Sequence, residues 1–228
     1  GGTEISRVGY IGGTFDGQML GASNNSVTVT GLGSTWYDNG TLVIGRDSSG
    51  NSLTISNGAS VNCGNAALPV AGCYIGRYAS ASNNNAQVTG VGSTWNNYNY
   101  LFIGSDGVGN SMSVSEGGTA DDVYGYIGNG ASAVDNQVTV WGNGTIWTNK
   151  NELTIGGDGS RNVLFINSGG TVYVGPGWAS GPSWDGSATY IGRGSAAISN
   201  RVVVSGSGAV LNTPRQLYIG YSGLQNSL

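Results

Sequence analysis

The sequence predicts an all-β fold, a parallel β-helix (β-solenoid) of about seven to eight rungs with loop insertions at its corners. The dipeptide Ile-Gly recurs eight times, at intervals of 24 to 36 residues, and each copy ends a short β-rich phrase. Glycine makes up 43 of the 228 residues and lies where the phrases turn, as corners with positive φ require. Strands at this spacing, with no hairpin signals between them, stack as successive rungs of a solenoid.

The first repeat unit gives the expected strands in order: residues 10–12 (YIG), 27–31 (VTVTG), 33–36 (GSTW), 42–45 (LVIG) and 51–58 (NSLTISNG). These phrases alternate apolar and small polar residues and favour β-branched side chains, which is typical of strands. The first phrases return around Trp95 and Trp147 and, with Leu211 in place of Trp, near the C-terminal end. The last phrase returns at residues 110–117 and 162–169. The repeat unit is therefore a pair of turns.

Residues at fixed repeat positions are predicted to stack from turn to turn inside or along the rod. The eight Ile side chains form one internal column, which is a main source of stability because each buried aliphatic side chain contributes about 1.5 to 3 kcal/mol. Asn51, Asn110 and Asn162 precede equivalent strands and are expected to form a side-chain ladder at a corner. The aromatic residues at repeat positions are interpreted as structural stack members: Trp36, Trp95, Trp147, Tyr10, Tyr74, Tyr126 and Tyr190.

The uniform repeat predicts one continuous β-solenoid over residues 1–228, without a linker. Residues 1–12 match residues 117–128 with no gap, so the first residue falls inside a repeat unit. Leu228 corresponds to Leu53, in the middle of a strand. A solenoid needs polar caps over its terminal rungs, and we therefore expect a fragment of a longer protein.

Composition disfavours several classes of function. Only 9 % of the residues are charged, the net charge is −4, and the eight cationic residues are scattered, whereas a phosphate-binding face needs clustered Lys and Arg. Nucleic acid is therefore not an expected partner. No apolar run is long enough to cross a bilayer, so the segment is not expected to be embedded in a membrane. The absence of histidine excludes Ser-His-Asp and Cys-His catalysis and the usual zinc sites, and neither a cofactor nor a metal is expected.

The two cysteines, Cys63 and Cys73, fall in one expanded corner. A disulfide between them would close a short loop and would suit an oxidising compartment such as the periplasm or the cell exterior. Two free thiols are the alternative. A metal or redox site of the CxxC type is not favoured, because the spacing is wide.

The phrases resemble the repeat of autotransporter (type V secretion) passenger domains, which also occurs in PEP-CTERM-associated bacterial proteins sorted to the cell exterior. Its pattern is V-T-G-x-G-S-x-W, then L-x-I-G, then L-x-I-x-N-G-G. Residues 29–36 (VTGLGSTW) and 88–95 (VTGVGSTW) fit the first part closely, and residues 42–45 and 53–58 fit the rest. The resemblance covers nearly the whole chain. Residues 143–147 and 205–211 depart from it, which affects the regularity of the last turns.

The resemblance implies a right-handed parallel β-helical stalk that is exported through the periplasm and the outer membrane. Such passengers are displayed on the bacterial cell surface or secreted, and their parent chains carry a translocator barrel. They commonly serve adhesion, aggregation or contact with host cells. The expected partner is therefore a host-cell surface protein or glycan, or another bacterial cell.

Three stretches interrupt the repetition: residues 13–22, 62–72 and 175–187. The last two interrupt the same place in the repeat and are expected to project from one corner, which we interpret as the binding face. The candidate binding residues in these two loops are Leu68, Pro69, Trp178, Trp184 and Asp185. Tryptophan buries a large area at low entropic cost and is favoured at interfaces. Packing of both tryptophans against the rod is the alternative.

The sequence predicts an adhesin-like binding module without catalytic residues. One alternative is a purely structural stalk or biofilm scaffold, in which case the isolated chain would bind nothing. A less favoured alternative is a polysaccharide-degrading β-helix enzyme, because stacked rungs can hold pairs of carboxylates. Asp47, Asp106 and Asp158 recur at one repeat position, but each precedes turn residues, and a corner Asp that bonds its own backbone explains them more simply.

Overall fold

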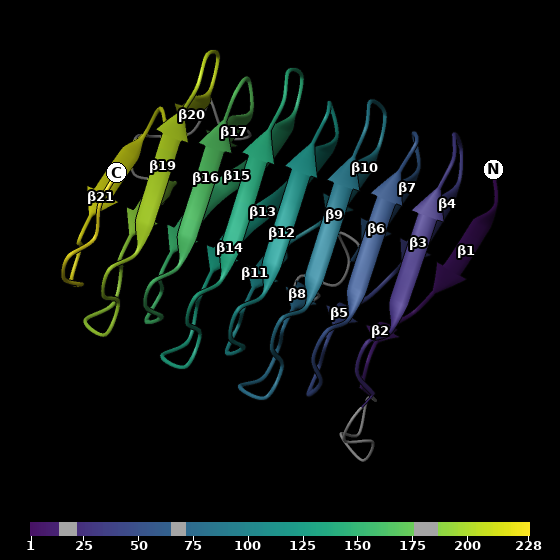
Figure 1. Ribbon diagram of the computed structural model, residues 1–228, viewed down its shortest axis with the longest axis horizontal. Coiled ribbons are helices and arrows are strands. Elements are labelled where there is room, and N and C mark those ends of the chain that lie inside the picture. Colours follow the sequence, from purple (N-terminus) through teal and green to yellow (C-terminus); the bar gives the residue numbers. More distant parts are fainter. Residues whose placement is uncertain (14–21, 65–71, 176–186) are drawn as a thin grey trace.

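The computed structural model describes residues 1–13, 22–64, 72–175 and 187–228. The chain coils into a rod with its termini at opposite ends (Figure 1). Every strand pairs in parallel with the strands of the neighbouring turns, which confirms the predicted parallel β-solenoid. Within the described residues there is no helix, and hence none long and apolar enough to span a membrane.

Each turn passes three faces in a fixed order. Face 1 consists of β1 (Thr3–Ser6), β4 (Thr35–Asp38), β7 (Ser60–Cys63), β10 (Thr94–Asn97), β17 (Thr171–Val174) and β20 (Val210–Asn212). Face 2 consists of β2 (Gly9–Ile11), β5 (Leu42–Ile44), β8 (Gly72–Ile75), β11 (Tyr100–Ile103), β18 (Ala188–Ile191) and β21 (Gln216–Ile219). Face 3 consists of β3 (Ser26–Thr30), β6 (Ser52–Ser56), β9 (Asn85–Thr89), β12 (Ser111–Ser115), β14 (Gln137–Trp141), β16 (Val163–Asn167) and β19 (Arg201–Ser205).

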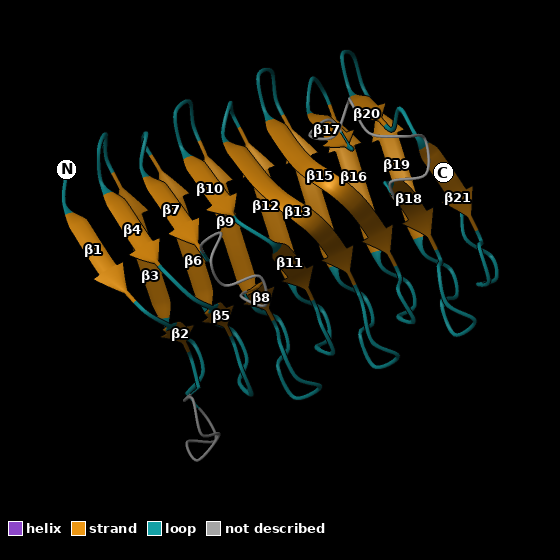
Figure 2. Ribbon diagram, turned by 180° about the vertical axis from the view of Figure 1, so that it is seen from behind, coloured by secondary structure: helices purple, strands orange, loops and turns teal. Residues whose placement is uncertain are grey.

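Two long strands, β13 (Thr119–Ile127) and β15 (Ile146–Ile155), run through face 1 and face 2 without a break. They join these faces into one 14-stranded sheet, while face 3 is a separate seven-stranded sheet. Figure 2 shows the strands of faces 1 and 2 side by side along the rod. The seven strands of face 3 correspond to about seven turns, numbered here from the N-terminal end, so that β13 and β14 form turn 5 and β15 and β16 form turn 6.

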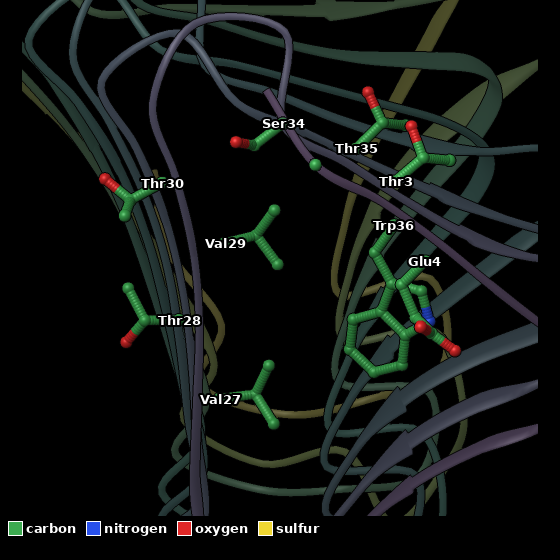
Figure 3. A pocket seen from close by; sticks show the side chains of 10 residues that line it. Thr3, Glu4, Val27, Thr28, Val29, Thr30, Ser34, Thr35 and Trp36 are labelled. Atoms are coloured by element: carbon green, nitrogen blue, oxygen red, sulfur yellow. The ribbon is translucent and has the colours of Figure 1, made fainter.

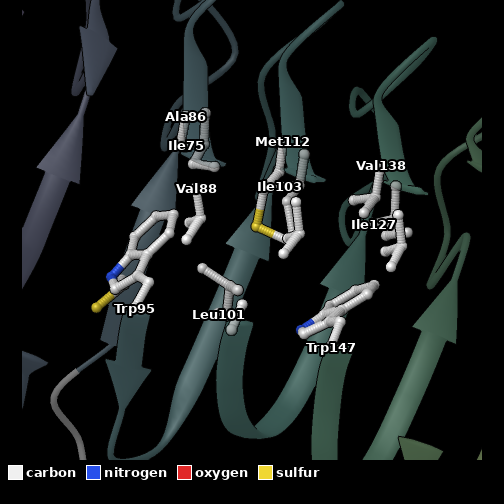
Figure 4. Close-up of a cluster of buried hydrophobic side chains, with 14 of the residues drawn as sticks. Ile75, Ala86, Val88, Trp95, Leu101, Ile103, Met112, Ile127, Val138 and Trp147 are labelled. Atoms are coloured by element: carbon white, nitrogen blue, oxygen red, sulfur yellow. The ribbon is translucent and has the colours of Figure 1, made fainter. Parts of the chain in front are cut away.

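The predicted isoleucine column forms the inner side of face 2. Each Ile pairs in register with its copy in the next turn, from Ile11 through Ile103 to Ile219. Seven of the eight are buried, and Ile219, in the last strand, is 48 % exposed. Val and Leu side chains from face 3 and Trp side chains from face 1 complete the core (Figure 4). One continuous interior therefore stabilises the rod.

The period of two turns comes from packing on the inner side of face 1. Trp36, Trp95 and Trp147 lie in every second turn, and Val61 and Ala120 fill the register positions between them. All five side chains are buried. Neighbouring turns lie only about 4.8 Å apart, so a large indole needs a small neighbour above and below to reach native packing density.

An unbroken asparagine ladder lies at the corner between faces 2 and 3. Asn51, Asn110 and Asn162 belong to it as predicted, and the ladder has a member in every turn: Asn25, Asn51, Asn84, Asn110, Asn136, Asn162, Asn200 and Asn226. Each side-chain amide donates to Oδ1 of the next Asn at 2.9 to 3.2 Å. The same Oδ1 atoms accept from backbone amides. The ladder thus satisfies the polar groups of this buried corner.

The ladder explains why a glycine follows each buried isoleucine of the column. Gly104, for example, has a φ of 70°, a conformation that L side chains rarely adopt. A Cβ on Gly104 would lie 2.3 Å from the side chain of Asn136, the ladder member of the next turn. The glycines of the other buried Ile-Gly pairs stand in the same relation to the next Asn. Glycine therefore supplies both the backbone turn and the space for the ladder.

Candidate functional site

Two of the predicted loops start and end at the corner between faces 1 and 2. One connects β7 to β8 and the other connects β17 to β18, four turns further along the rod, which corresponds to about 19 Å. The predicted binding residues within them, Leu68, Pro69, Trp178, Trp184 and Asp185, lie outside the described residues. The surface between the two loops, on turns 4 to 6, is described in full and forms the first part of the candidate site.

The predicted disulfide is present between Cys63, at the end of β7, and Cys73, in β8. Both cysteines are 1 % exposed, and the bridge holds the two ends of the first loop together at the corner. Structural disulfides are typical of oxidising compartments, such as the periplasm or the cell exterior.

A cavity of about 530 Å³ is the opening of the core at the first turn. Val27 and Val29 point across it toward Trp36, while Thr28 and Thr30 point away from it (Figure 3). A second cavity of about 470 Å³ opens at the last turn between Val204, Leu211 and Leu217. Both cavities are lined by side chains that continue the core columns. They are ends of the solenoid interior and not sites in its wall.

A smaller hollow of about 230 Å³ lies in the wall at the corner between faces 1 and 2. It is lined by Asn96, Asn97, Tyr98, Asp121 and Lys150. Nζ of Lys150 lies 3.5 Å from Oδ2 of Asp121, and both side chains are partly exposed. Tyr98 is 55 % exposed. The hollow thus offers an aromatic ring, an amide and a salt bridge to solvent.

A buried polar column lies directly behind this hollow. Asn97, Asp122 and Asn149 occupy equivalent inward positions in turns 4, 5 and 6 and are at most 2 % exposed. Oδ2 of Asp122 accepts a hydrogen bond of 2.7 Å from Nε1 of Trp147. Trp36 donates to Ser6 one turn below in the same way. One turn below Trp95 the equivalent position holds Cys63 of the disulfide. The indole nitrogen of Trp95 has no hydrogen-bond partner among the described residues.

Burial raises the pKa of Asp122 well above its ordinary value, and the hydrogen bond from Trp147 opposes this shift only in part. An acid whose pKa is higher in the folded than in the unfolded state stabilises the fold while it is protonated. This contribution is complete below its unfolded-state pKa of about 3.9. This contribution is lost as the pH rises through the folded-state pKa. We expect Asp122→Asn, which keeps the acceptor for Trp147, to be more stable than the wild type at pH 8, with little difference at pH 4. Urea denaturation at both pH values measures the effect.

The matched control is Asp121→Asn. Asp121 is next in the chain but points to solvent, so its replacement should change stability little at either pH. If the wild type lost no stability relative to Asp122→Asn between pH 4 and pH 8, a raised pKa of the buried Asp122 would be contradicted.

The second part of the candidate site is an aromatic strip on the outer side of face 2. It consists of seven rings that alternate with the inward Leu and Ile positions: Tyr74, Tyr100, Phe102, Tyr124, Tyr126, Tyr190 and Tyr218. Tyr74, Phe102 and Tyr126 form a nearly parallel stack with ring centroids 5.0 and 4.9 Å apart. Tyr100 stacks on Tyr124 beside them. The flat sides of the rings stack on one another, which leaves ring edges and tyrosine hydroxyl groups on the outer side.

Arg77 and Arg193 each lie against a tyrosine ring that has an aromatic neighbour in only one of the two adjacent turns. Tyr190 stacks on Tyr218 on one side, and the guanidinium of Arg193 lies 4.7 Å from the Tyr190 ring centroid. Tyr74 stacks on Phe102 on one side, and the guanidinium of Arg77 lies 4.7 Å from the Tyr74 ring centroid. Each arginine therefore covers the ring face that looks toward the turn below.

Glu152 is the hydrogen-bonding centre of the strip in turn 6. Its Oε1 accepts from Thr154 Oγ1 at 2.9 Å and from Arg193 Nη1 at 2.8 Å. Glu152 is 8 % exposed and Thr154 is fully buried between the neighbouring turns. Burial and the nearby Glu152 carboxylate raise the pKa of Tyr126, so its hydroxyl stays protonated.

Sequence reasoning predicted stacking for Tyr10, Tyr74, Tyr126 and Tyr190. The last three belong to the strip, whereas Tyr10 pairs in register with Val43, and the strip was not identified as a surface. The signal was available in the Tyr-Ile-Gly phrase: because the Ile points inward, the preceding Tyr must point outward. Three of the seven arginines, Arg46, Arg77 and Arg193, directly follow an Ile-Gly pair. Arg77 and Arg193 lie beside rings of the strip, and Arg46 lies beside Tyr78.

Carboxylates elsewhere in the described residues are dispersed. Arg46 forms an ion pair with Asp47, and Arg161 pairs with Asp135. Asp121 and Asp122, adjacent in the chain, point to opposite sides of β13, as side chains alternate along a strand. Across residues 1–13, 22–64, 72–175 and 187–228, no group of three Cys, Asp or Glu side chains is arranged to hold a metal ion.

The described molecule belongs by its architecture to the parallel β-solenoids, with an aromatic strip and a polar corner hollow as its candidate binding surface. Comparison of the chain with models of protein families, with curated proteins and with solved structures gives no significant match. Functional inference therefore depends on the surface chemistry of the solenoid itself.

Proposed function

We propose that this chain is the adhesin-like binding module of an exported bacterial protein of the autotransporter passenger kind. It is displayed at the cell surface or secreted, and it contacts glycans or proteins of host cells, of the extracellular matrix or of other bacteria. The observation that carries the proposal is the aromatic strip of face 2. In a chain with 9 % charged residues, seven aromatic rings gather on the outer side of face 2, and Arg77 and Arg193 lie against two of them. Tyrosine and arginine are residue types that dominate binding hot spots.

Two further features support this proposal. The Cys63–Cys73 disulfide fits a protein that passes through the periplasm. The corner hollow and the middle of the strip lie between the ends of the two irregular loops. The dispersed or ion-paired carboxylates favour binding over hydrolysis.

A structural stalk is the second candidate, and the unbroken asparagine ladder favours it. A ladder that ties every turn to the next gives a stiff rod that could hold another domain away from a surface. The two functions differ in one respect: the isolated stalk would bind nothing, whereas the binding module would attach by itself.

Replacement of Tyr100 and Tyr124 together by alanine tests the binding function. Both rings are half-buried on the outer side of face 2 and stack at 5.0 Å, so their loss removes part of the surface and leaves the core intact. We expect attachment of the purified protein to cultured epithelial cells or to immobilised matrix to fall at least about tenfold, with an unchanged circular dichroism spectrum.

Trp141→Ala is the matched control, because Trp141 is an aromatic residue of face 3 that is 40 % exposed. It should leave attachment unchanged. A separate Trp178→Ala and Trp184→Ala variant tests the predicted loop contribution. A wild-type protein that attaches to nothing would favour the stalk. Attachment that survives both sets of substitutions would contradict the role of the strip and the loops and would place the contact elsewhere on the rod.

A further inference from the structure

Two sites on face 2 share the sequence Tyr-Ile-Gly-Arg: residues 74–77 and residues 190–193. In both, the guanidinium lies 4.7 Å from the centroid of the Tyr ring, and the other side of that ring is covered by the next aromatic residue of the strip. The two sites therefore hold an arginine in the same place, four turns apart.

The sites differ in the turn below the arginine. Beneath Arg193 the chain supplies a carboxylate, because Glu152 Oε1 accepts from Arg193 Nη1 at 2.8 Å. Beneath Arg77 the equivalent positions are Thr41 and Val43. Among the described residues no carboxylate lies within ion-pairing distance of Arg77.

Arg77 is nevertheless held in place. Besides the Tyr74 ring, its guanidinium lies 5.3 Å from the centroid of Tyr78, and the Arg46 guanidinium lies 4.9 Å from the same ring. Asp47 pairs with Arg46, so the charge of Arg77 is the one left without a partner in this cluster of described residues. A fixed guanidinium loses little entropy when it binds a planar anion, and carboxylates match its geometry.

We propose that Arg77 binds a carboxylate of an acidic polysaccharide, in the place that Glu152 takes beside Arg193. This inference rests on the proposed binding function of face 2 and specifies its ligand. The exposed parts of the strip are ring edges and hydroxyl groups, which suit a hydrogen-bonding polymer better than the apolar centre of a protein partner. The ligand class is therefore a uronate-containing glycan.

Isothermal titration of the full chain with a galacturonate oligomer tests this inference. We expect binding by the wild type, and at least about tenfold weaker binding of the methyl-esterified oligomer, which lacks the charge. Arg77→Gln should weaken binding of the free acid about tenfold. Arg201→Gln is the control, because Arg201 also lies over an aromatic ring, Phe165, but on face 3, and it should bind like the wild type.

A second pair of variants supplies the carboxylate from within the chain. Thr41→Glu should reproduce the Glu152 arrangement, pair with Arg77 and weaken oligomer binding as much as Arg77→Gln does. Thr41→Gln, which has the same size without the charge, should bind normally. Thermal melting of each variant verifies that the fold is retained.

Several results would overturn the inference: equal affinity for the free acid and its ester, unchanged binding by Arg77→Gln, or no binding of the acid by the folded wild type. Equally tight binding of a pentaglutamate peptide would assign the site to acidic protein segments instead. If these tests fail while the Tyr100 and Tyr124 variant still loses attachment, face 2 binds a neutral partner. If uronate binding holds while attachment does not depend on the strip, only the adhesive function fails.

Discussion

Replacing Gly104 by alanine is expected to lower the free energy of unfolding by about 3 kcal/mol. Two costs add up. Alanine at a φ of 70° is strained, because its Cβ approaches the following carbonyl oxygen. The same Cβ would stand 2.3 Å from the Asn136 side chain, and this asparagine cannot move aside without breaking its bonds to both neighbours in the ladder.

Urea denaturation followed by circular dichroism measures this effect. Gly2→Ala is the matched control, because no atom lies within 4 Å of the position where its Cβ would be and its φ lies outside the left-handed region. This variant should unfold at nearly the wild-type urea concentration. If Gly104→Ala were as stable as Gly2→Ala, the proposed reason for the Ile-Gly repeat would be wrong.

Asn136→Ala is expected to destabilise the rod by a similar amount, about 3 kcal/mol. Oδ1 of Asn136 accepts from the backbone and side-chain amides of Asn110 at 2.9 and 3.2 Å. Its Nδ2 donates to the Gly107 carbonyl at 3.0 Å and to Asn162 Oδ1 at 3.1 Å. Alanine removes all four bonds at a fully buried corner, where unsatisfied polar groups are costly.

Asn25→Ala provides the comparison, since Asn25 is the exposed first member of the same ladder. Solvent can replace its hydrogen bonds, so we expect a loss below about 1 kcal/mol. Equal losses at both positions would show that the ladder contributes through backbone geometry and not through its buried hydrogen bonds.

Much of the scaffold could be predicted from the sequence because each turn repeats the same local requirements. The recurrence of Ile-Gly predicted the internal column. The fixed positions of Trp36, Trp95 and Trp147 predicted a structural role, and all three are buried. The pairing of Cys63 with Cys73 followed from their place in one expanded corner. These features depend on alternation within a strand and on short distances along the chain.

The ladder was predicted only in part. Asn51, Asn110 and Asn162 begin recognisable phrases, whereas Asn84, Asn136 and Asn200 lie in the other type of turn, where the surrounding sequence differs. Turn lengths of 24 to 36 residues hide their equivalence in the linear sequence. The structure shows it because parallel strand pairing aligns every turn regardless of the loops between strands.

The amino-acid sequence by itself determined that this chain coils into a parallel solenoid, which side chains fill it and where its corners turn. The tertiary structure alone decided which residues meet across turns. Arg193 finds Glu152 beneath it, whereas Arg77, in the same four-residue phrase, stands above Thr41. The physical reason is that strand alternation is local, whereas the neighbour in the next turn is set by register across loops of variable length.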